Sequence, residues 1–255
     1  MEQTKLVGYS KTLSFHKIRE IYLSEAATRT KLNYQDYLLR IVEQQILAKI
    51  KGSINRKTQI AAFPQIKRLE EFDFSYQPNL NEKLISELAV LDFLNTAANI
   101  IFVSTPGVGK THLAISIGIK ATNAMKRVLF YTAERLTEEL TSAEVSGQLN
   151  KKLDTLSRVD LLIRVDLLIR VDLLIRDELG YLSLSIQTSR LFSQMESIRY
   201  EKGSIIVISN KPFEQWGEIY NDDIVVSAVL DRLLHQSYPF LINYKSFMLE
   251  NIIKD

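Results

Sequence analysis

The run from Ser104 to Thr111 constrains the fold of this chain more than any other feature of its sequence. It lies between a strand-like stretch, Asn99 to Val103, and a helix-like stretch, His112 to Met125. Two glycines at positions 107 and 109 allow backbone N–H groups to turn inward, because no Cβ blocks the approach of a polyphosphate. This context is typical of a phosphate-binding loop, and it predicts a nucleotide site at the end of a strand.

The predicted nucleotide-binding residues are the loop and the residue that follows it: Ser104, Thr105, Pro106, Gly107, Val108, Gly109, Lys110, Thr111 and His112. Lys110 is expected to reach the β and γ phosphates, and the Thr111 hydroxyl is expected to bind Mg²⁺. Ser104 departs from the usual G-x-x-x-x-G-K-[ST] pattern, whose first glycine serves the turn out of the strand. We expect Ser104 to restrict the loop without removing the site.

Composition excludes several other classes of protein. The chain has 255 residues and no cysteine, so it can bury an α/β core but can form neither a disulfide framework nor a thiolate metal site. Its apolar stretches are short and interrupted by charge, and Met1 to Lys5 lack the apolar core of a signal peptide. The sequence therefore predicts a cytoplasmic protein with no membrane segment.

Charge divides the chain into two parts. Residues 1–68 contain thirteen Lys or Arg and five Asp or Glu, whereas residues 69–255 contain nineteen and twenty-five. A basic helical domain at 1–68, followed by an acidic body, suggests that the first part meets an anionic partner, most commonly nucleic acid. A solvated basic helix face would give the same composition.

The basic part reads as helical. Asn33 can cap a helix, and apolar residues recur at helical spacing, so they are expected to form a core. These residues are Tyr34, Leu38, Ile41, Val42 and Ile46. Gly52, Ser53, Asn55 and Pro64 then weaken the pattern, which predicts a linker near residues 52–70.

Strands alternate with helices in the body. The candidate strands are Ile100 to Ser104, Val128 to Tyr131, Leu173 to Asp177 and Ile205 to Ser209. The candidate helices span 111–125, 134–146 and 188–202. Such alternation predicts an α/β fold with a parallel sheet flanked by helices, and its phosphate site lies at the carboxyl ends of the strands.

Two acids follow the third candidate strand. Hydrolysis of ATP needs one acid to hold Mg²⁺ and usually a second to orient the attacking water. Asp177 and Glu178 are predicted to fill these roles, although an ordinary acidic strand end has the same appearance.

Two later residues complete the candidate catalytic set. Asn210 ends a strand and is predicted to sense the γ-phosphate or position water, but an Asn before Lys211-Pro212 is also a common turn residue. Arg232 lies on an otherwise apolar helical stretch. It could stabilise transition-state charge in its own site or in a neighbouring subunit, or form a surface salt bridge.

Several segments together resemble the IstB-like helper ATPases of insertion sequences, which belong to the AAA+ superfamily and are related to helicase loaders and replication initiators. The segments are RLEEFDFSYQP, STPGVGKTHLA, LLIRDELGYL, ISNKPFEQWGEI and LDRLLHQS. The resemblance implies a P-loop AAA+ protein that binds ATP and Mg²⁺, binds DNA, forms a homo-oligomer and assists a cognate transposase. If the basic part contacts the phosphates of DNA, we expect that binding to be sequence-tolerant.

The resemblance also implies residue roles. Gly107 to Thr111 would bind phosphate and Mg²⁺, Asp177 and Glu178 would be the Walker B acids, Asn210 would be the sensor and Arg232 the arginine finger. Three positions depart from the family pattern. Ser104 replaces a glycine, Arg176 replaces an aliphatic residue, and Ser246-Phe247-Met248-Leu249 stands where a Ser-Tyr-Arg-Leu run is common.

A tandem repeat leads into the two acids. Arg158 to Ile163 recurs as Arg164 to Ile169 and as Arg170 to Ile175. A six-residue unit is too short for a repeat architecture, and because six is even, each copy fits the same strand position with the same side chains on each face. We therefore expect three competing registers for this strand, and extra copies that extend a helix, a strand or a loop.

Arg176 adds a charge to a strand that helices should cover on both faces. The sequence offers it no partner nearby, so we expect an unpaired buried guanidinium. The repeat and Arg176 together predict a nucleotide binder with slow hydrolysis. Three functions stay open: a transposase helper, a helicase loader, and a relic of a mobile element that no longer hydrolyses ATP.

Overall fold

The computed structural model describes residues 34–156, 172–180 and 184–242, and five residues nearer the start, at 15, 17, 18, 20 and 21. It divides into two compact units, Met1–Arg56 and Lys57–Asp255. The second unit contains the phosphate loop and both predicted acids.

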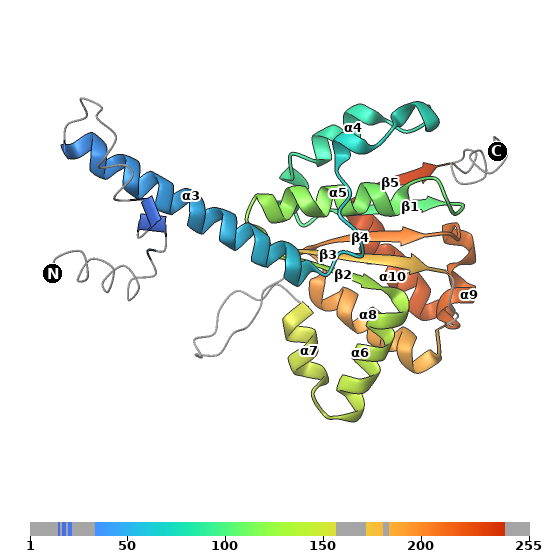
Figure 1. The fold of residues 1–255 in the computed structure, drawn as a ribbon. Helices are drawn as coiled ribbons and strands as arrows, with labels where there is room; N and C mark the ends of the chain where they lie inside the picture. Colours follow the sequence, from blue (N-terminus) through green and yellow to red (C-terminus); the bar gives the residue numbers. More distant parts are fainter. Residues whose placement is uncertain are drawn as a thin grey trace, which may run out of the picture. The chain divides into compact units, whose positions relative to one another are not determined.

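Five strands of the described ranges form one sheet in the order β2-β3-β4-β1-β5, and each neighbouring pair is parallel (Figure 1). The strands are β1 (Asn99–Ser104), β2 (Val128–Thr132), β3 (Leu173–Leu179), β4 (Ser204–Ser209) and β5 (Ser237–Ile242). The predicted parallel sheet is confirmed, and four strands lie where the sequence places them. The edge strand β5 is an addition to the prediction.

Helices connect the strands. The α-helices are α3 (Tyr34–Ala61), α4 (Glu82–Leu88), α5 (Lys110–Asn123), α6 (Ala133–Val145), α7 (Leu149–Leu156), α8 (Ile186–Arg199), α9 (Trp216–Tyr220) and α10 (Asp223–His235). Short 3₁₀ turns are η1 (Leu69–Glu71), η2 (Phe74–Tyr76), η3 (Asp92–Leu94) and η4 (Phe213–Gln215). In the part of the chain that the structure describes, no helix combines the length and apolar composition needed to cross a membrane.

The sheet packs against a helical layer on each side. We call the side that packs against α5 the α5 face and the side that packs against α8 the α8 face. Because side chains alternate along a strand, Ile100 and Phe102 of β1 belong to the core cluster with α5, whereas Ile101 and Val103 belong to the cluster with α8. The α5 face also holds residues of α4, and the α8 face holds residues of α6, α7, α9 and α10. Figure 1 shows α5 on one side of the sheet and α8 and α10 on the other.

Helix α3 is longer than the sequence predicts. It continues through Gly52, Ser53 and Asn55 and ends at Ala61, so the predicted linker at 52–70 is wrong over its first part. Glycine and asparagine weaken a helix by less than about 1 kcal/mol each, and packing can outweigh this. Within the second unit Ala61 is fully buried, and the Thr58 hydroxyl donates to Thr122 of α5 at 3.1 Å.

The predicted apolar stripe of α3 is mostly not a core. Only Ile41 is buried, at 6% exposure, whereas the side chains of four stripe residues are exposed. The exposed residues are Tyr34, Leu38, Val42 and Ile46. Gln45 is buried one turn from Ile41, and it accepts from the backbone N–H groups of Lys17 and Ile18 at 2.9 and 3.2 Å. The buried face of this helix is therefore partly polar, which apolar periodicity cannot reveal.

Candidate nucleotide-binding site

The phosphate loop leaves β1 and enters α5 through two glycines in the left-handed region. Gly107 has φ 85° and Gly109 has φ 95°, a conformation that residues with a Cβ rarely adopt. A Cβ at Gly109 would also lie 2.5 Å from Cε2 of Phe72. Both backbone angle and space therefore require glycine at position 109.

Lys110 places its ammonium inside this loop. The Nζ donates to the carbonyls of Ser104 and Thr105, each at 2.7 Å, and the residue is only 7% exposed. Burial lowers the pKa of Lys110 to about 8, although nearby Asp177 opposes the shift. A phosphate group would supply the negative charge that the buried ammonium lacks.

Thr111 and Asp177 meet at the carboxyl ends of β1 and β3. The Thr111 hydroxyl donates to Oδ2 of Asp177 at 2.8 Å, although the residues lie 66 positions apart. Burial raises the pKa of Asp177, while the bonds from Thr111 and from the Glu178 N–H oppose this rise. Carboxylate and hydroxyl oxygens are ligands that suit Mg²⁺, so this pair fits the predicted metal ligands.

Glu178 lies at an irregularity in β3. The register between β3 and β4 shifts between Arg176 and Leu179, and Glu178 has φ 63°. Its side chain is exposed, and its N–H donates to Oδ1 of Asp177 at 2.7 Å. Burial, Asp177 and Glu134 all raise the pKa of Glu178. The bulge thus turns this carboxylate out of the sheet, beside the metal-binding candidates.

Asn210 follows β4 and faces Gly180, which follows β3. The Oδ1 of Asn210 is buried with no hydrogen-bond partner among the described residues. Gly180 has φ 117°, and a Cβ there would lie 2.2 Å from that same oxygen. An unpaired buried amide oxygen at the carboxyl edge of the sheet is available to a water or a ligand.

Gly180 also selects the register of β3. The described third copy of the hexad supplies the strand from Asp172 onward, and copies one and two lie outside the described residues. A shift by one six-residue unit would place Leu174 at the position of Gly180, where φ and space exclude a Cβ. It would also place Val171 at the position of Asp177. The three registers are therefore not equivalent, contrary to the sequence prediction.

Ser104 is part of the structure of the loop. It is buried at the end of β1, and its hydroxyl donates to the carbonyl of Ile242 at the end of β5. Its φ lies outside the left-handed region, so glycine is not required at this position. The hydroxyl thus anchors the loop to the edge strand.

Arg176 is paired, and the expectation of an unpaired guanidinium is wrong. It is fully buried on the α8 face, where its Nη1 donates to Oε1 of Glu196 at 2.6 Å. Its Nη2 donates to the Tyr220 hydroxyl at 3.3 Å, and its guanidinium lies 5.1 Å from the ring centroid of Phe192. Glu196 lies on α8 and Tyr220 on α9, so the partners come from elements far along the chain.

The segment before the sheet packs against the loop. Phe72 contacts the ring of His112 edge-on at 5.3 Å between centroids, and Nε2 of His112 lies 2.8 Å from the carbonyl of Arg68. Lys120 on α5 pairs with Glu70 at 2.5 Å. The predicted site residues do not include this segment, although the aromatic residues at 72, 74 and 76 are a signal in the sequence that could have indicated packing here.

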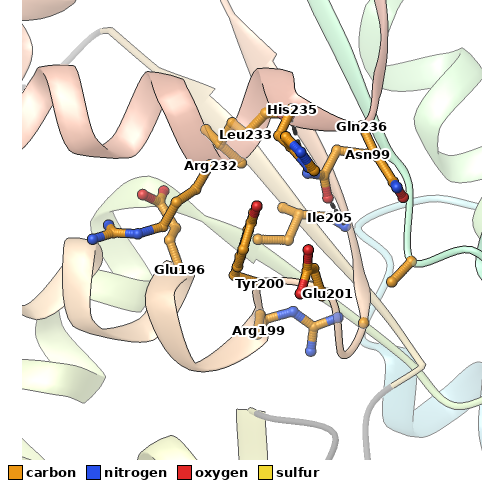
Figure 2. Close-up of a pocket in the computed structure, with 12 residues that line it drawn as sticks. Asn99, Glu196, Arg199, Tyr200, Glu201, Ile205, Arg232, Leu233, His235 and Gln236 are labelled. Atoms are coloured by element: carbon orange, nitrogen blue, oxygen red, sulfur yellow. Dashed lines mark hydrogen bonds between the residues drawn. The ribbon is translucent and has the colours of Figure 1, made fainter.

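Arg232 lies away from the phosphate loop of its own chain. It belongs to the last turn of α10, which leads into the amino end of β5, whereas the loop follows the carboxyl end of β1. Its Nη1 donates to Ser193 of α8 at 3.3 Å. Figure 2 shows Arg232 with Glu196 at a small pocket that Asn99 and Ile205, near the amino ends of β1 and β4, also line. Arg232 therefore lies toward the end of the sheet opposite the one that carries its own phosphate loop.

The sheet order, the loop and the acid at the end of β3 define a P-loop nucleotide-binding protein of the AAA+ class. This chain belongs to the family of IstB-like ATP binding proteins, whose family model matches residues 11–254. It is 38% identical over 228 residues to the insertion sequence IS21 putative ATP-binding protein of Pseudomonas aeruginosa, covering 89% of this chain and 82% of that protein.

Solved structures share the fold at lower identity. The replication initiator DnaA bound to AMPPCP and single-stranded DNA aligns with a TM-score of 0.57 at 20% identity, covering 76% of this chain and 56% of that chain. The DnaC helicase loader aligns with a TM-score of 0.50 at 22% identity, covering 64% and 88%. Both likenesses concern the fold, and they confirm the predicted AAA+ architecture.

Proposed function

We propose that this ATP-binding protein hydrolyses ATP with Mg²⁺, and that it works as a DNA-binding oligomer that assists the transposase of its insertion sequence. The carrying observation is the contact of Thr111 with Asp177 beside the buried ammonium of Lys110. This contact brings a hydroxyl, a carboxylate and a phosphate-binding cation to one edge of the sheet.

Each residue then has a distinct task. Lys110 neutralises phosphate charge. The oxygens of Thr111 and Asp177 would hold Mg²⁺, and the ion would supply positive charge to offset that of the phosphates. Glu178, turned out by the bulge, orients the attacking water, and its raised pKa suits a general base. The free amide oxygen of Asn210 accepts from that water, whereas its amide N–H₂ would be the group that donates to the γ-phosphate.

Arg232 acts in this proposal on the ATP of a neighbouring subunit. Arg232 lies toward the end of the sheet opposite its own phosphate loop, which supports a role in a neighbouring site. A guanidinium can stabilise the negative charge that develops on the phosphate in the transition state. The oligomer is therefore part of the proposed mechanism.

Hydrolysis is tested by steady-state ATPase assays of the full chain. Glu178→Gln should retain ATP binding and lose turnover, because it keeps the size of the side chain and removes the base. Glu134→Gln is the matched control, since Glu134 is a neighbouring carboxylate with no proposed task. Turnover by Glu178→Gln equal to that of the parent protein would refute the proposed base.

DNA binding is assigned to residues 1–68. Support comes from the excess of basic residues there, and from exposed cations on α3 within the first unit, Lys49, Lys51 and Arg56. The similar DnaA structure contains single-stranded DNA, which agrees with this proposal. Changing the three cations to Gln should reduce the slope of log affinity against log salt by about 0.9 for each lost phosphate contact on duplex DNA. Lys83→Gln, in the second unit, is the control and should leave the slope unchanged.

A helicase loader is the second candidate, because the DnaC loader shares the fold. The relatives named for insertion sequences favour the transposase. Copurification of the full chain with the transposase of the same element, compared with a replicative helicase, separates these functions. A hydrolysis-impaired relic would bind ATP without turnover in the parent protein.

A further inference from the structure

The buried pair of Arg176 and Glu196 leaves one carboxylate oxygen unused. Oε1 of Glu196 lies 2.6 Å from Arg176 Nη1 and 3.3 Å from the Tyr220 hydroxyl. Oε2 is buried and has no hydrogen-bond partner among the described residues. A buried carboxylate oxygen without a donor costs free energy of folding. The pairing with Arg176 does not explain why this oxygen is kept, whereas a second role of Glu196 would.

That carboxylate shares a pocket with Arg232. Both residues line a cavity of about 20 Å³ at the amino edge of the sheet (Figure 2). This volume accommodates one water molecule and is too small for a nucleotide or a metabolite. Burial raises the pKa of Glu196, and Arg176 and, to a smaller degree, Arg232 oppose that rise. The charges of Glu196 and Arg232 therefore act on each other across the pocket.

Helix α8 holds Arg232 at a second point. Ser193 accepts from Arg232 Nη1 at 3.3 Å, and it precedes Glu196 by three residues. Residues three apart lie on one side of a helix, so the hydroxyl and the carboxylate are presented to Arg232 together. One helix thus contacts Arg176, which directly precedes Asp177, and also Arg232.

We propose that Glu196 is a positioning residue that serves two sites, holding Arg176 beside the metal-binding end of β3 and orienting Arg232 toward a neighbouring subunit. The proposal rests on the trans role of Arg232. A guanidinium on a long side chain has many rotamers, and a fixed carboxylate beside it restricts them before the neighbour arrives. Glu196 would then affect a neighbour's turnover even when its own subunit cannot hydrolyse ATP.

Mixed oligomers of full-length chains test this effect. The acceptor is Arg232→Ala, whose site is intact but which lacks the finger. The donor is Glu178→Gln, which can supply Arg232 but has no active base. Neither variant hydrolyses ATP with its own residues alone, so turnover in the mixture measures how well the donor supplies Arg232 to the acceptor. The same mixture is then made with two other donors, Glu178→Gln/Glu196→Gln and Glu178→Gln/Tyr220→Phe, and the turnover rates are compared.

We expect the Glu196→Gln donor to recover about tenfold less turnover than its parent donor, a loss typical of a misplaced catalytic group. The Tyr220→Phe donor should recover as much as the parent donor. Tyr220 contacts Arg176 and Glu196 in the same network, and it does not line the pocket with Arg232. It therefore controls for general disturbance of the buried pair.

Three outcomes count against the proposal in different ways. Equal recovery with and without Glu196→Gln would overturn it and leave the trans role of Arg232 intact. Equal loss with Glu196→Gln and Tyr220→Phe would assign the effect to packing. No recovery with the parent donor would overturn the trans role, and this proposal with it. If Glu196→Gln fails to fold by circular dichroism, Ser193→Ala removes the other contact of α8 with Arg232 and should lower donation in the same assay.

Discussion

The two faces of the sheet place their polar groups differently. On the α5 side, the buried charges of the described residues, Lys110 and Asp177, lie at the carboxyl end beside the phosphate loop. The interior of that side contains buried hydroxyls, such as those of Ser116 and Thr122, and no buried charge among the described residues. On the α8 side, Arg176 and Glu196 lie in the interior, both at 2% exposure or less. A bound ligand can neutralise the charges of the α5 face, because they lie at the proposed nucleotide site. On the α8 face, Arg176 and Glu196 neutralise each other inside the protein.

Arg199 extends this pattern on the α8 face. It is 1% exposed, its Nη1 donates to the Leu156 carbonyl at the end of α7, and its Nη2 donates to the Ser204 carbonyl at 2.6 Å. Buried arginines therefore join α7, α8 and β4 through the α8 face. We therefore expect removal of a charged side chain to lower the free energy of unfolding most on the α8 face, where the charged groups have only protein groups as partners.

Removing one partner of the buried pair should give the largest effect. Arg176→Ile leaves Glu196 buried without its cation, and we expect it to lower the free energy of unfolding by about 3–5 kcal/mol. Chemical denaturation of the two proteins measures the difference. An unchanged midpoint would show that the α8 face tolerates an unbalanced carboxylate as well as the α5 face does.

The triple variant Arg176→Ile, Glu196→Leu and Tyr220→Phe is the control for this change. It removes the whole polar network, and packed apolar side chains often equal a buried ion pair in stability. Most of the lost free energy of unfolding should return. If the triple variant is as unstable as Arg176→Ile, the damage comes from shape and not from charge.

Ser104 tests a polar group of the α5 face that has a protein partner. Ser104→Gly removes the hydrogen bond to the Ile242 carbonyl and adds backbone freedom, so we expect a loss of about 1–3 kcal/mol in the free energy of unfolding. Ser104→Ala removes only the bond and should lose less. ATP affinity, by titration calorimetry, should remain close to that of the parent, because the residues proposed to contact phosphate are unchanged.

The ammonium of Lys110 is a charge of the α5 face that a bound phosphate is proposed to neutralise. Its pKa is lowered to about 8, so the free protein loses this proton as pH rises through that value. Bound phosphate should favour the charged form of Lys110. Because the charged fraction of the free protein falls about tenfold between pH 7 and pH 9, ATP affinity should fall by about the same factor. At pH 8 half of the free protein already carries this proton, so binding should take up about half a proton per site. The uptake would be seen as a dependence of calorimetric enthalpy on buffer ionisation heat. Lys110→Arg should show no uptake, because its guanidinium stays charged; uptake equal to that of the parent would exclude Lys110 as its source.

Apolar packing should be alike on the two faces. Ile206→Val on the α5 face and Ile205→Val on the α8 face each remove one buried methylene, and each should cost about 0.5–1.5 kcal/mol. Ile206 is fully buried and Ile205 is 3% exposed. Denaturation midpoints that differ strongly between these variants would locate the asymmetry in packing rather than in charge.

The sequence predicts those parts of the site that depend on local spacing. Gly107, Gly109, Lys110 and Thr111 carry their geometry within one loop, and Asp177 follows an apolar run that reads as a strand. Local patterns also predict four of the strands. These patterns do not predict the edge strand β5, because Pro239 interrupts its apolar run and because a helix-like stretch leads directly into it.

Partners that lie far along the chain could not be predicted in this way. Glu196 is 20 residues from Arg176, and Tyr220 is 44 residues from it. Nothing in the periodicity of α8 marks Glu196 as a buried residue. The same reason explains Ser104, whose acceptor at Ile242 lies 138 residues away. Each departure from the family pattern within the described body is matched by a partner that only the fold brings near.

Gly180 gives the hexad array an evolutionary property. Because this glycine and the two acids before it fix the strand from its downstream end, the acids keep their place whatever number of whole hexads precedes them. Alleles with one, two or three copies should thus encode chains that place Asp177 and Glu178 at the same end of β3.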